Sequence, residues 1–324
     1  MTLHASGNPA APAGTRLESR ARSYARLGKL DVYDYYLSVL VATSAVLVSD
    51  VDLRTAPMLV LFLLGEIATV VALVAFDDVT GYRDGSDIAN YGPDDPLRKK
   101  LRKPLVAGTL TEAQALRFGW ATAGAGALLW AGSLALAPHA PLWTVVMMAA
   151  TYVIALQYSY GLKLSYHGLQ EAFLVALGAV LVLAPHALAT GRFSGFLLVQ
   201  AVLFGIGVLM FGVYSNTNDV DGDRAVRRPT VAALTSERGN ALFIGALSAS
   251  EFLIGVVASA TGVAPWWFAV LMLPATALRA RQYDLGFRCA DIMRARRIGF
   301  TVHRTSVALL VLANLLAGLA GAAA

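Results

Sequence analysis

The amino-acid sequence predicts an all-α integral membrane protein whose nine transmembrane helices form one bundle around a central cavity. Three observations lead to this fold class: few charged residues, long apolar blocks, and basic residues confined almost entirely to alternate loops. Of the 324 residues, 57% are hydrophobic and only 15% are charged, with a mean hydropathy of +0.60. A soluble domain carries about 25% charged residues, so this composition favours a lipid-embedded fold.

Apolar segments close to the roughly 20 residues needed to cross the hydrocarbon core recur along the chain. The second and sixth of them run directly into acid-rich sequence, and the last follows a long basic stretch. The seventh and eighth are separated only by a short turn around Gly262 and Pro265, which makes them the least distinct pair. The predicted helices lie at about 33–50, 57–76, 115–136, 141–159, 172–190, 195–215, 240–261, 264–279 and 303–322.

Lysine and arginine predict the orientation in the membrane. If the N-terminus is cytoplasmic, 24 of the 26 basic residues fall on the cytoplasmic side, and only Arg54 and Arg192 fall on the other. The positive-inside rule favours this arrangement. Nine spans then place the C-terminus outside and the loops near 77–114, 160–171, 216–239 and 280–302 in the cytoplasm.

The first thirty residues lack the early apolar core of a signal peptide. We interpret residues 1–30 as a partly disordered, basic cytoplasmic arm that can rest on anionic membrane lipid, and residues 31–324 as the membrane domain. The net charge of +5 follows from the basic cytoplasmic loops, so no nucleic-acid partner is predicted. The single cysteine, Cys289, excludes an intrachain disulfide and any multi-cysteine metal site.

Two acid-rich clusters, at residues 77–87 and 216–223, lie where long predicted helices leave the membrane on the cytoplasmic side. Residues three, four or seven apart share a helix face, so several oxygen side chains of each cluster project together. Stacked carboxylates repel each other unless a cation lies between them, and hard oxygens together with phosphate suit Mg²⁺. Asp221 points away from its neighbours and is a weaker candidate. The candidate metal ligands from this spacing are Asp77, Asp84, Asn216, Asp219 and Asp223, and the family resemblance given below adds Asp87.

Such metal ions would neutralise a diphosphate leaving group as its C–O bond breaks and leaves an allylic cation. Tyrosine rings could stabilise that cation, although tyrosines at this depth also serve as interfacial anchors. An intramembrane glutamate could act as a base or cation stabiliser, or be protonated and hydrogen-bonded to a neighbouring helix. The candidate catalytic residues are Asp77, Asp78, Asp219, Asp223, Tyr160, Tyr214 and Glu66.

Basic residues follow both acid-rich clusters. Part of this pattern reflects topology, but phosphate needs cationic donors, and the planar fork of arginine suits it. Lys163 stands alone in a short loop, where a lysine is either a snorkelling anchor or a ligand. The candidate diphosphate-binding residues are Arg102, Lys103, Lys163, Arg224 and Arg228.

Four segments, in order across about 160 residues, resemble motifs of the UbiA superfamily of prenyltransferases. Residues 77–87 are similar to its first aspartate motif, with the closest likeness to the menaquinone branch, the 1,4-dihydroxy-2-naphthoate prenyltransferases, whose pattern is Asn-Asp-x-x-Asp-x-x-x-Gly-x-Asp. Residues 102–108 resemble the family's Arg-Pro-Leu-x-x-Gly segment, and 158–171 its tyrosine-containing loop. Residues 216–230 resemble the second motif, Asn-x-x-Asp-x-Asp-x-Asp-Arg with a later Arg-Thr.

The resemblance implies specific roles. By analogy, Mg²⁺–diphosphate is held by Asp77, Asp87, Asn216, Asp219 and Asp223, and phosphate is contacted by Lys103, Lys163 and Arg224. The chain also departs from the family pattern. Asp77 replaces the first asparagine, Gly81 replaces the central aspartate, and residues 88–97 lengthen the first loop. Either Asp78 or Asp84 substitutes for the missing aspartate, or fewer ligands remain on that side.

The residues and the resemblance together predict a Mg²⁺-dependent intramembrane prenyltransferase that transfers an isoprenyl group to an aromatic or quinone-precursor acceptor. A UbiA-type terpene cyclase, which ionises the same substrate class without an acceptor, is the alternative. A transporter would need ionisable residues through most of the membrane depth, whereas here they gather at one face. A CDP-alcohol phosphotransferase motif begins at Asp221 but fails at Val226.

Overall fold

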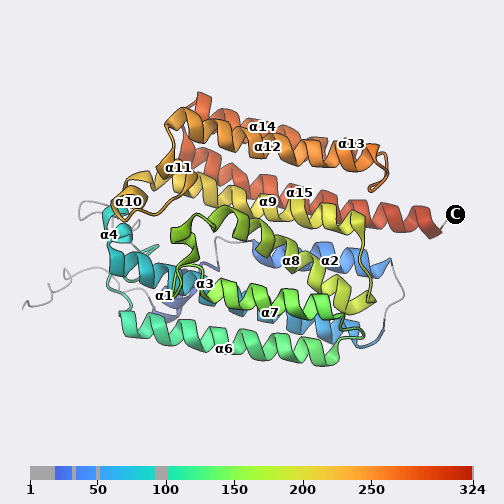
Figure 1. Cartoon of the computed structure of the whole chain (residues 1–324), viewed down its shortest axis with the longest axis horizontal. Helices are drawn as coiled ribbons and strands as arrows, with labels where there is room; N and C mark the ends of the chain where they lie inside the picture. The colour runs from blue at the N-terminus through green and yellow to red at the C-terminus, as the bar shows by residue number, and fades with distance from the viewer. Residues whose placement is uncertain (1–18, 31–33, 49–51, 92–100, 323–324) are drawn as a thin grey trace, which may run out of the picture.

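The computed structural model describes residues 19–30, 34–48, 52–91 and 101–322. Within these ranges every regular element is a helix (Figure 1). The short elements are α1 (Arg20–Leu27), η1 (Tyr35–Leu37), α4 (Ser86–Asn90), η2 (Leu164–His167), α10 (Val220–Ala225), α11 (Val231–Leu234), α13 (Phe268–Leu271) and the π-helical η3 (Asp284–Arg288). The longer ones are α2 (Ser38–Leu47), α3 (Thr55–Asp84), α6 (Glu112–Leu136), α7 (Leu142–Leu156), α8 (Gln170–Thr190), α9 (Gly195–Asn218), α12 (Glu237–Ala260), α14 (Leu273–Tyr283) and α15 (Ile292–Ala322).

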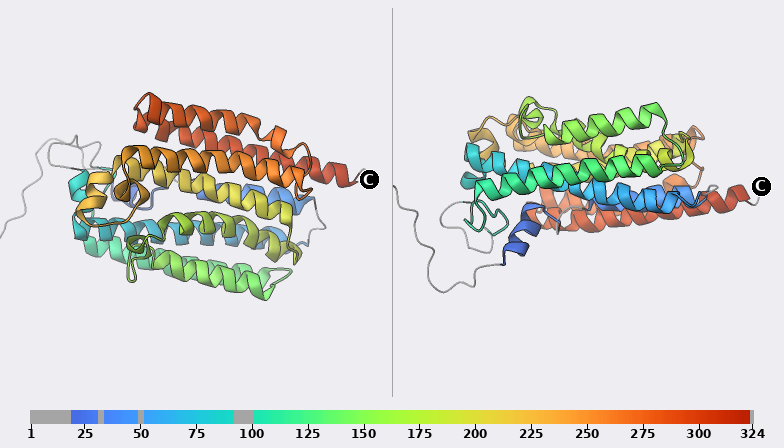
Figure 2. Two further views of the ribbon diagram at one scale, coloured as in Figure 1. Left: turned by 45° about the horizontal axis from the view of Figure 1, so that its top comes forward. Right: turned by 90° about the horizontal axis from the view of Figure 1, so that it is seen from below.

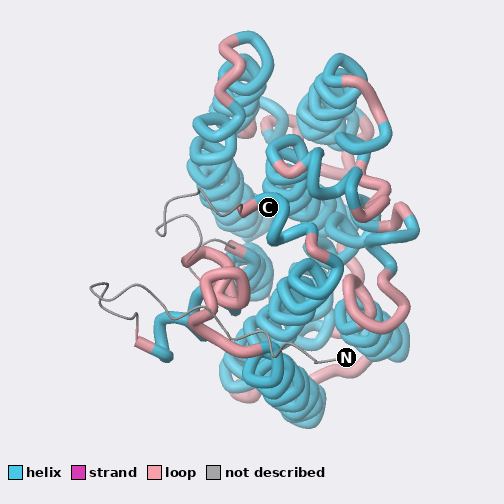
Figure 3. The backbone as a smooth tube through the Cα atoms, turned by 90° about the vertical axis from the view of Figure 1, so that its left-hand side faces the viewer, coloured by secondary structure: helices cyan, strands magenta, loops and turns pink. Residues whose placement is uncertain are grey.

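The long helices run side by side along one direction and form a single bundle (Figures 1 and 2). The short helices α4 and α10 lie at one end of this bundle, and the C-terminus lies at the other end (Figure 1). Figure 3 looks along the bundle from the end that holds α4 and α10, so that the long helices are seen end-on.

Each of the nine segments predicted to cross the membrane coincides with a helix among the described residues, and the eighth is divided into α13 and α14. Five helices in this part of the chain are long and apolar enough to span a membrane: α3, α8, α9, α12 and α15. Shorter apolar helices cover 35–47 and 142–156. Several spans are therefore present, while the number nine stays a prediction.

The centre of the bundle is built by α8 and α9, which pack closely. A Cβ added at Gly178 would lie 2.6 Å from the Cα of Gly205, so the two backbones touch where both positions lack a side chain. Small residues allow this close approach between membrane helices. By contrast, α12 is strongly apolar yet few of its residues are buried, and Trp266 beside it is 80% exposed. That outer apolar surface is suited to lipid.

Helix ends bring the two acid-rich clusters together. The left-handed backbone of Gly85, with φ of +86°, ends α3 directly after Asp84 and lets α4 begin. Helix α9 ends at Asn218, and α10 follows after Asp219. Helix α4 then packs against α10, with the Asn90 side chain against Gly222.

The N-terminal helix α1 docks at the same end of the bundle. Its Ser19 side chain caps the first turn by accepting from the Arg22 backbone, and its Leu27 is buried among residues of α3 and the 101–110 loop. The Tyr24 ring lies 5.0 Å from that of Phe118 on α6. The arm predicted at 1–30 thus contains a docked helix, and its first 18 residues lie outside the described residues.

Candidate active site

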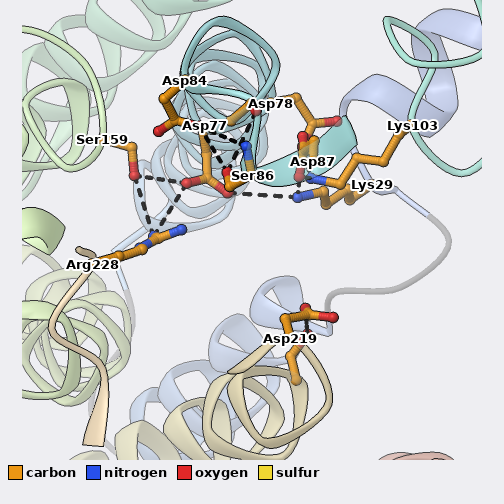
Figure 4. A network of polar contacts seen from close by, with 12 residues as sticks. Lys29, Asp77, Asp78, Asp84, Ser86, Asp87, Lys103, Ser159, Asp219 and Arg228 are labelled. Carbon is orange, nitrogen blue, oxygen red and sulfur yellow. Dashed lines mark hydrogen bonds and ion pairs between the residues drawn. The ribbon is translucent and has the colours of Figure 1, made fainter. Parts of the chain in front are cut away.

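A cavity of about 160 Å³ lies between the ends of α3 and α9, and both acid-rich clusters line it (Figure 4). Its lining includes four carboxylates and Asn216, and six cationic side chains surround them. The carboxylates belong to Asp77, Asp87, Asp219 and Asp223, and the cations to Arg26, Lys29, Arg102, Lys103, Arg228 and Arg296. Eight of the predicted site residues are therefore brought into one cavity.

Asp77 and Asp78 lie about two turns before the end of α3, and both are ion-paired. Asp77 Oδ1 accepts from Ser159 Oγ at 2.6 Å and from Arg228 Nη2 at 3.3 Å. Asp78 is 1% exposed, and its Oδ1 lies 2.8 Å from Lys103 Nζ and 3.0 Å from Lys29 Nζ. Its other oxygen, Oδ2, is buried without a hydrogen-bond partner among the described residues.

Asp87 occupies the space that the missing side chain of Gly81 leaves free. A Cβ added at Gly81 would lie 2.9 Å from the Asp87 carboxyl carbon. Asp87 Oδ1 lies 2.8 Å from Lys103 Nζ, so one lysine joins Asp78 and Asp87. Burial raises the pKa of Asp87 to about 6, against the lowering effect of Lys103.

Asp84 lies outside the cavity lining. Its carboxylate accepts from the Tyr166 hydroxyl and, at 2.8 Å, from Ser86 Oγ. Burial and this hydrogen bond raise the pKa of Tyr166, so the phenol stays protonated and keeps donating. Asp84 therefore ties the end of α3 to the 158–167 loop.

The second cluster has neutral partners. Asp219 accepts from Asn218 Nδ2 at 2.9 Å and from Ser215 Oγ at 3.4 Å. Asp223 is buried and accepts from Thr230 Oγ1 at 3.0 Å. Burial raises the pKa of Asp223 to about 6, although the nearby Arg228 charge lowers it.

The side chains of Lys103 and Arg228 are two of the cations that contact carboxylates of the first acid-rich cluster. Burial by itself lowers the pKa of Lys103, but the charges of Asp78 and Asp87 raise it well above its usual value. For Arg228, burial again lowers the pKa, but Asp77 and the other nearby acidic groups together raise it above its usual value. The Arg228 backbone N–H also donates to the Asp223 carbonyl at 2.8 Å. Both side chains are therefore fixed positive charges.

Besides Asp78 and Asp84, five more predicted residues lie outside the cavity lining. Lys163 is exposed, with Nζ 5.3 Å from the Tyr166 ring centroid, and Arg224 donates to the carbonyls of Ala233 and Thr235. Tyr160 stacks on Phe76 at 4.9 Å, and the fully buried Tyr214 packs near Phe287. Glu66 is buried deeper in α3, where Ser38 Oγ lies 2.9 Å from both of its carboxylate oxygens.

Sequence reasoning missed Lys29, Ser159 and Arg296. Lys29 was counted only among the basic residues that predict topology, and its place in the site follows from the docking of α1. Ser159 lies in the 158–171 segment that carries the family resemblance, so that segment was the available signal. Arg296 follows η3 on α15, where sequence offers no pairing with the acid-rich clusters.

The donor set fits a metal held jointly with phosphate. Its oxygens are hard ligands of the kind that Mg²⁺ prefers, and next to the cavity-lining Asp77 the buried Asp78 Oδ2 has no hydrogen-bond partner within the described ranges. In the described part of the chain, no three Asp, Glu, His or Cys side chains converge closely enough to hold an ion by themselves. Mg²⁺ commonly binds through one or two carboxylates plus substrate phosphates, so this arrangement suits a metal–diphosphate complex.

Comparisons with known proteins show what the chain is similar to. The model of the UbiA prenyltransferase family matches residues 36–301. An apo UbiA homologue from Aeropyrum pernix K1 has a TM-score of 0.62 at 20% identity, with 86% of this chain and 97% of that chain covered. A homologue from Archaeoglobus fulgidus bound to DMAPP and Mg²⁺ has a TM-score of 0.57 at 14% identity, with coverages of 89% and 99%.

A structure of digeranylgeranylglyceryl phosphate synthase has a TM-score of 0.59 at 11% identity, with 91% of this chain and 99% of that chain covered. No curated protein matches. At these sequence identities, the structural likeness shows a shared fold. The match to the family model shows that the amino-acid sequence is similar as well.

Proposed function

This chain belongs to the UbiA prenyltransferase family, and on that premise we propose that it ionises an isoprenyl diphosphate with the help of Mg²⁺ and transfers the prenyl group to an aromatic or quinone-precursor ring. It is a multi-pass membrane protein. The observation that carries the proposal is that both acid-rich clusters line one cavity together with six cationic side chains. Homologues from Archaeoglobus fulgidus bound to DMAPP or GPP with Mg²⁺ support the substrate class.

The first step is binding of the diphosphate. Bound Mg²⁺ supplies charge neutralisation to the leaving group as its C–O bond breaks. The residues that would hold it are Asp77, Asp87, Asn216, Asp219 and Asp223. Ser159 and Arg228 fix the orientation of Asp77, and Thr230 fixes that of Asp223.

The cavity also provides cations for the phosphate oxygens. Lys103 and Arg228 stay protonated at physiological pH, because neighbouring carboxylates raise their pKa values. Arg102 lines the same cavity. Lys163 and Arg224 stay candidates for phosphate contact, which would require their side chains to leave the positions described above.

The isoprenoid tail needs an apolar path. A second cavity of about 280 Å³ adjoins the first, and Lys29 and Tyr35 line both. Its other lining residues include Glu66, Ile67, Val70 and Val71 of α3. We assign the tail to this cavity and keep Glu66, in its wall, as the candidate base or cation stabiliser. The diphosphate cavity then faces the cytoplasm, with the C-terminus outside.

Product analysis tests this proposal. Purified protein in lipid nanodiscs would be incubated with Mg²⁺ and dimethylallyl, geranyl, farnesyl or geranylgeranyl diphosphate, with and without 1,4-dihydroxy-2-naphthoate. We expect diphosphate release coupled to a prenylated ring only when the acceptor is present. A cyclic hydrocarbon formed from the diphosphate alone would instead identify the terpene cyclase alternative. No diphosphate release in any mixture would overturn both.

A further inference from the structure

The residue that follows the C-cap of the N-terminal helix brings a cation to the first acid-rich cluster, close to the candidate metal ligand Asp77. Lys29 follows the end of α1, and its Nζ lies 3.0 Å from Asp78 Oδ1 and 3.8 Å from Asp77 Oδ2 (Figure 4). Its side chain is only 14% exposed. Because Asp78 Oδ1 also contacts Lys103, two ammonium groups lie on one carboxylate oxygen.

The position of Lys29 is set by packing rather than by a flexible tether. Leu27 is fully buried against α3, and a Cβ added at Gly28 would lie 3.1 Å from a Val71 methyl group. Lys29 itself has a φ of +48°, a left-handed conformation that is uncommon for residues other than glycine. The backbone thus turns at Lys29 in a way that directs its side chain into the cavity it lines.

A buried carboxylate needs a cation, and a buried ammonium group needs an anion. In the free protein these needs are met between the acid-rich cluster and the lysines. Asp77 is among the residues that would hold the metal, so a metal bound there would compete with Lys29 for the Asp77 carboxylate, and Lys29 would then need a new partner. The phosphate oxygens of the substrate provide that partner within the same cavity.

We propose that Lys29 takes the place of the metal in the free protein and passes to the diphosphate when the Mg²⁺–diphosphate complex binds. The inference rests on the proposed function for the identity of the ligand. Its consequence is that Mg²⁺ and diphosphate bind as a unit: Lys29 opposes Mg²⁺ alone and favours diphosphate once Mg²⁺ is present. A residue that only bound phosphate, or only stabilised the fold, would not produce effects of opposite sign.

Isothermal titration of the full chain in nanodiscs tests this directly, with two probes: Mg²⁺ alone, and inorganic pyrophosphate at saturating Mg²⁺. For Lys29→Met we expect Mg²⁺ alone to bind about threefold or more tightly than in the wild type. Pyrophosphate should bind about tenfold more weakly, because one charge-assisted contact is lost. Lys29→Arg keeps the charge and should stay close to wild type in both titrations.

Arg20→Met is the matched control, since it removes a positive charge from an exposed position of the same helix. Both affinities should stay unchanged in this variant, and thermal unfolding checks that each variant is folded. Changes of the same sign in Lys29→Met, no change in either titration, or an equal response in Arg20→Met would each overturn the proposal.

These titrations need no turnover, so the two proposals fail separately. Opposite changes in Lys29→Met support the exchange of partners even if no prenylated product is found. Conversely, a protein that transfers prenyl groups but shows no opposite changes retains the proposed function and rejects the role of Lys29.

Discussion

The two acid-rich clusters differ in how their carboxylates are neutralised. In the first, Asp77, Asp78 and Asp87 contact Lys29, Lys103 and Arg228. In the second, Asp219 and Asp223 accept hydrogen bonds from neutral hydroxyl and amide groups. If the proposed metal binds in this cavity, it would compete with cations on one wall and, among the described residues, with neutral hydrogen-bond donors on the other. Under the proposal, the first cluster would therefore have to exchange partners, whereas the second would not have to give up an ion pair.

Removing a carboxylate from the second cluster should have the largest effect. Asp219→Ala or Asp223→Ala takes away a proposed metal ligand, and turnover should fall about 10²–10³-fold. Initial rates of diphosphate release measure this. Asp221→Ala, an exposed residue of the same helix outside the cavity lining, is the matched control and should keep near wild-type rates. Wild-type turnover in Asp219→Ala and Asp223→Ala would contradict the mechanism.

Removing a cation from the first cluster should lower the stability of the ligand-free protein. Lys103→Met leaves Asp87 without the ammonium group that lies 2.8 Å away. We expect the free energy of unfolding to fall by about 3 kcal/mol, the range for breaking a buried ion pair. Thermal unfolding with and without Mg²⁺ measures this, and Mg²⁺ should restore part of the loss. An unchanged melting temperature would show that the pair contributes nothing.

Acid should weaken metal–diphosphate binding on both walls. Burial raises the pKa values of Asp87 and Asp223 to about 6, so each takes up a proton as the pH falls through that value. Binding releases those protons, and the apparent affinity for pyrophosphate with Mg²⁺ should therefore fall below pH 6. The expected slope is about tenfold per pH unit for each carboxyl. Asp223→Asn should reduce the slope, and a flat profile from pH 7 to about pH 5 would count against both carboxylates as ligands.

Restoring the missing motif aspartate should have the smallest effect. In Gly81→Asp, the new carboxyl would meet that of Asp87, since even a Cβ at this position lies 2.9 Å from it. Repulsion between like charges should lower turnover about threefold to tenfold. The double variant Gly81→Asp with Asp87→Asn relieves the repulsion and should recover most of the activity. Turnover above wild type in Gly81→Asp alone would show that the Asp87 carboxylate does not stand in for the motif aspartate that is missing at position 81.

The fold was largely predictable because apolar length and the distribution of basic residues are properties of the chain itself. The helix positions follow from them, whereas the number of spans does not, since α2, α7 and α14 are short. The family match confirms the predicted UbiA resemblance. Closeness to the menaquinone branch stays a prediction.

The candidate site was predictable where its residues lie close together in the sequence. It was not predictable where residues distant in the sequence meet only through the packing of helices. Asp219 and Asp223 share a helix-end segment, so their spacing carried the information. Tyr214 lies two residues before Asn216, and on a helix such neighbours point to nearly opposite sides, which is why its ring packs toward η3 instead of the cavity. The position of Lys29 could not be predicted without knowing how α1 docks on the bundle. The contact of the Asp87 side chain with Gly81 could not be predicted without knowing the turn at Gly85.

The proposed function requires that both acid-rich clusters hold the same metal–diphosphate complex. The most direct measurement is a structure determined with Mn²⁺ in place of Mg²⁺ and a slowly reacting geranyl thiodiphosphate, with the ions located by anomalous scattering. We expect Mn²⁺ between α3–α4 and α9–α10, ligated by oxygens from both clusters and by the diphosphate. Ions ligated by one cluster only, or a diphosphate bound outside this cavity, would contradict it.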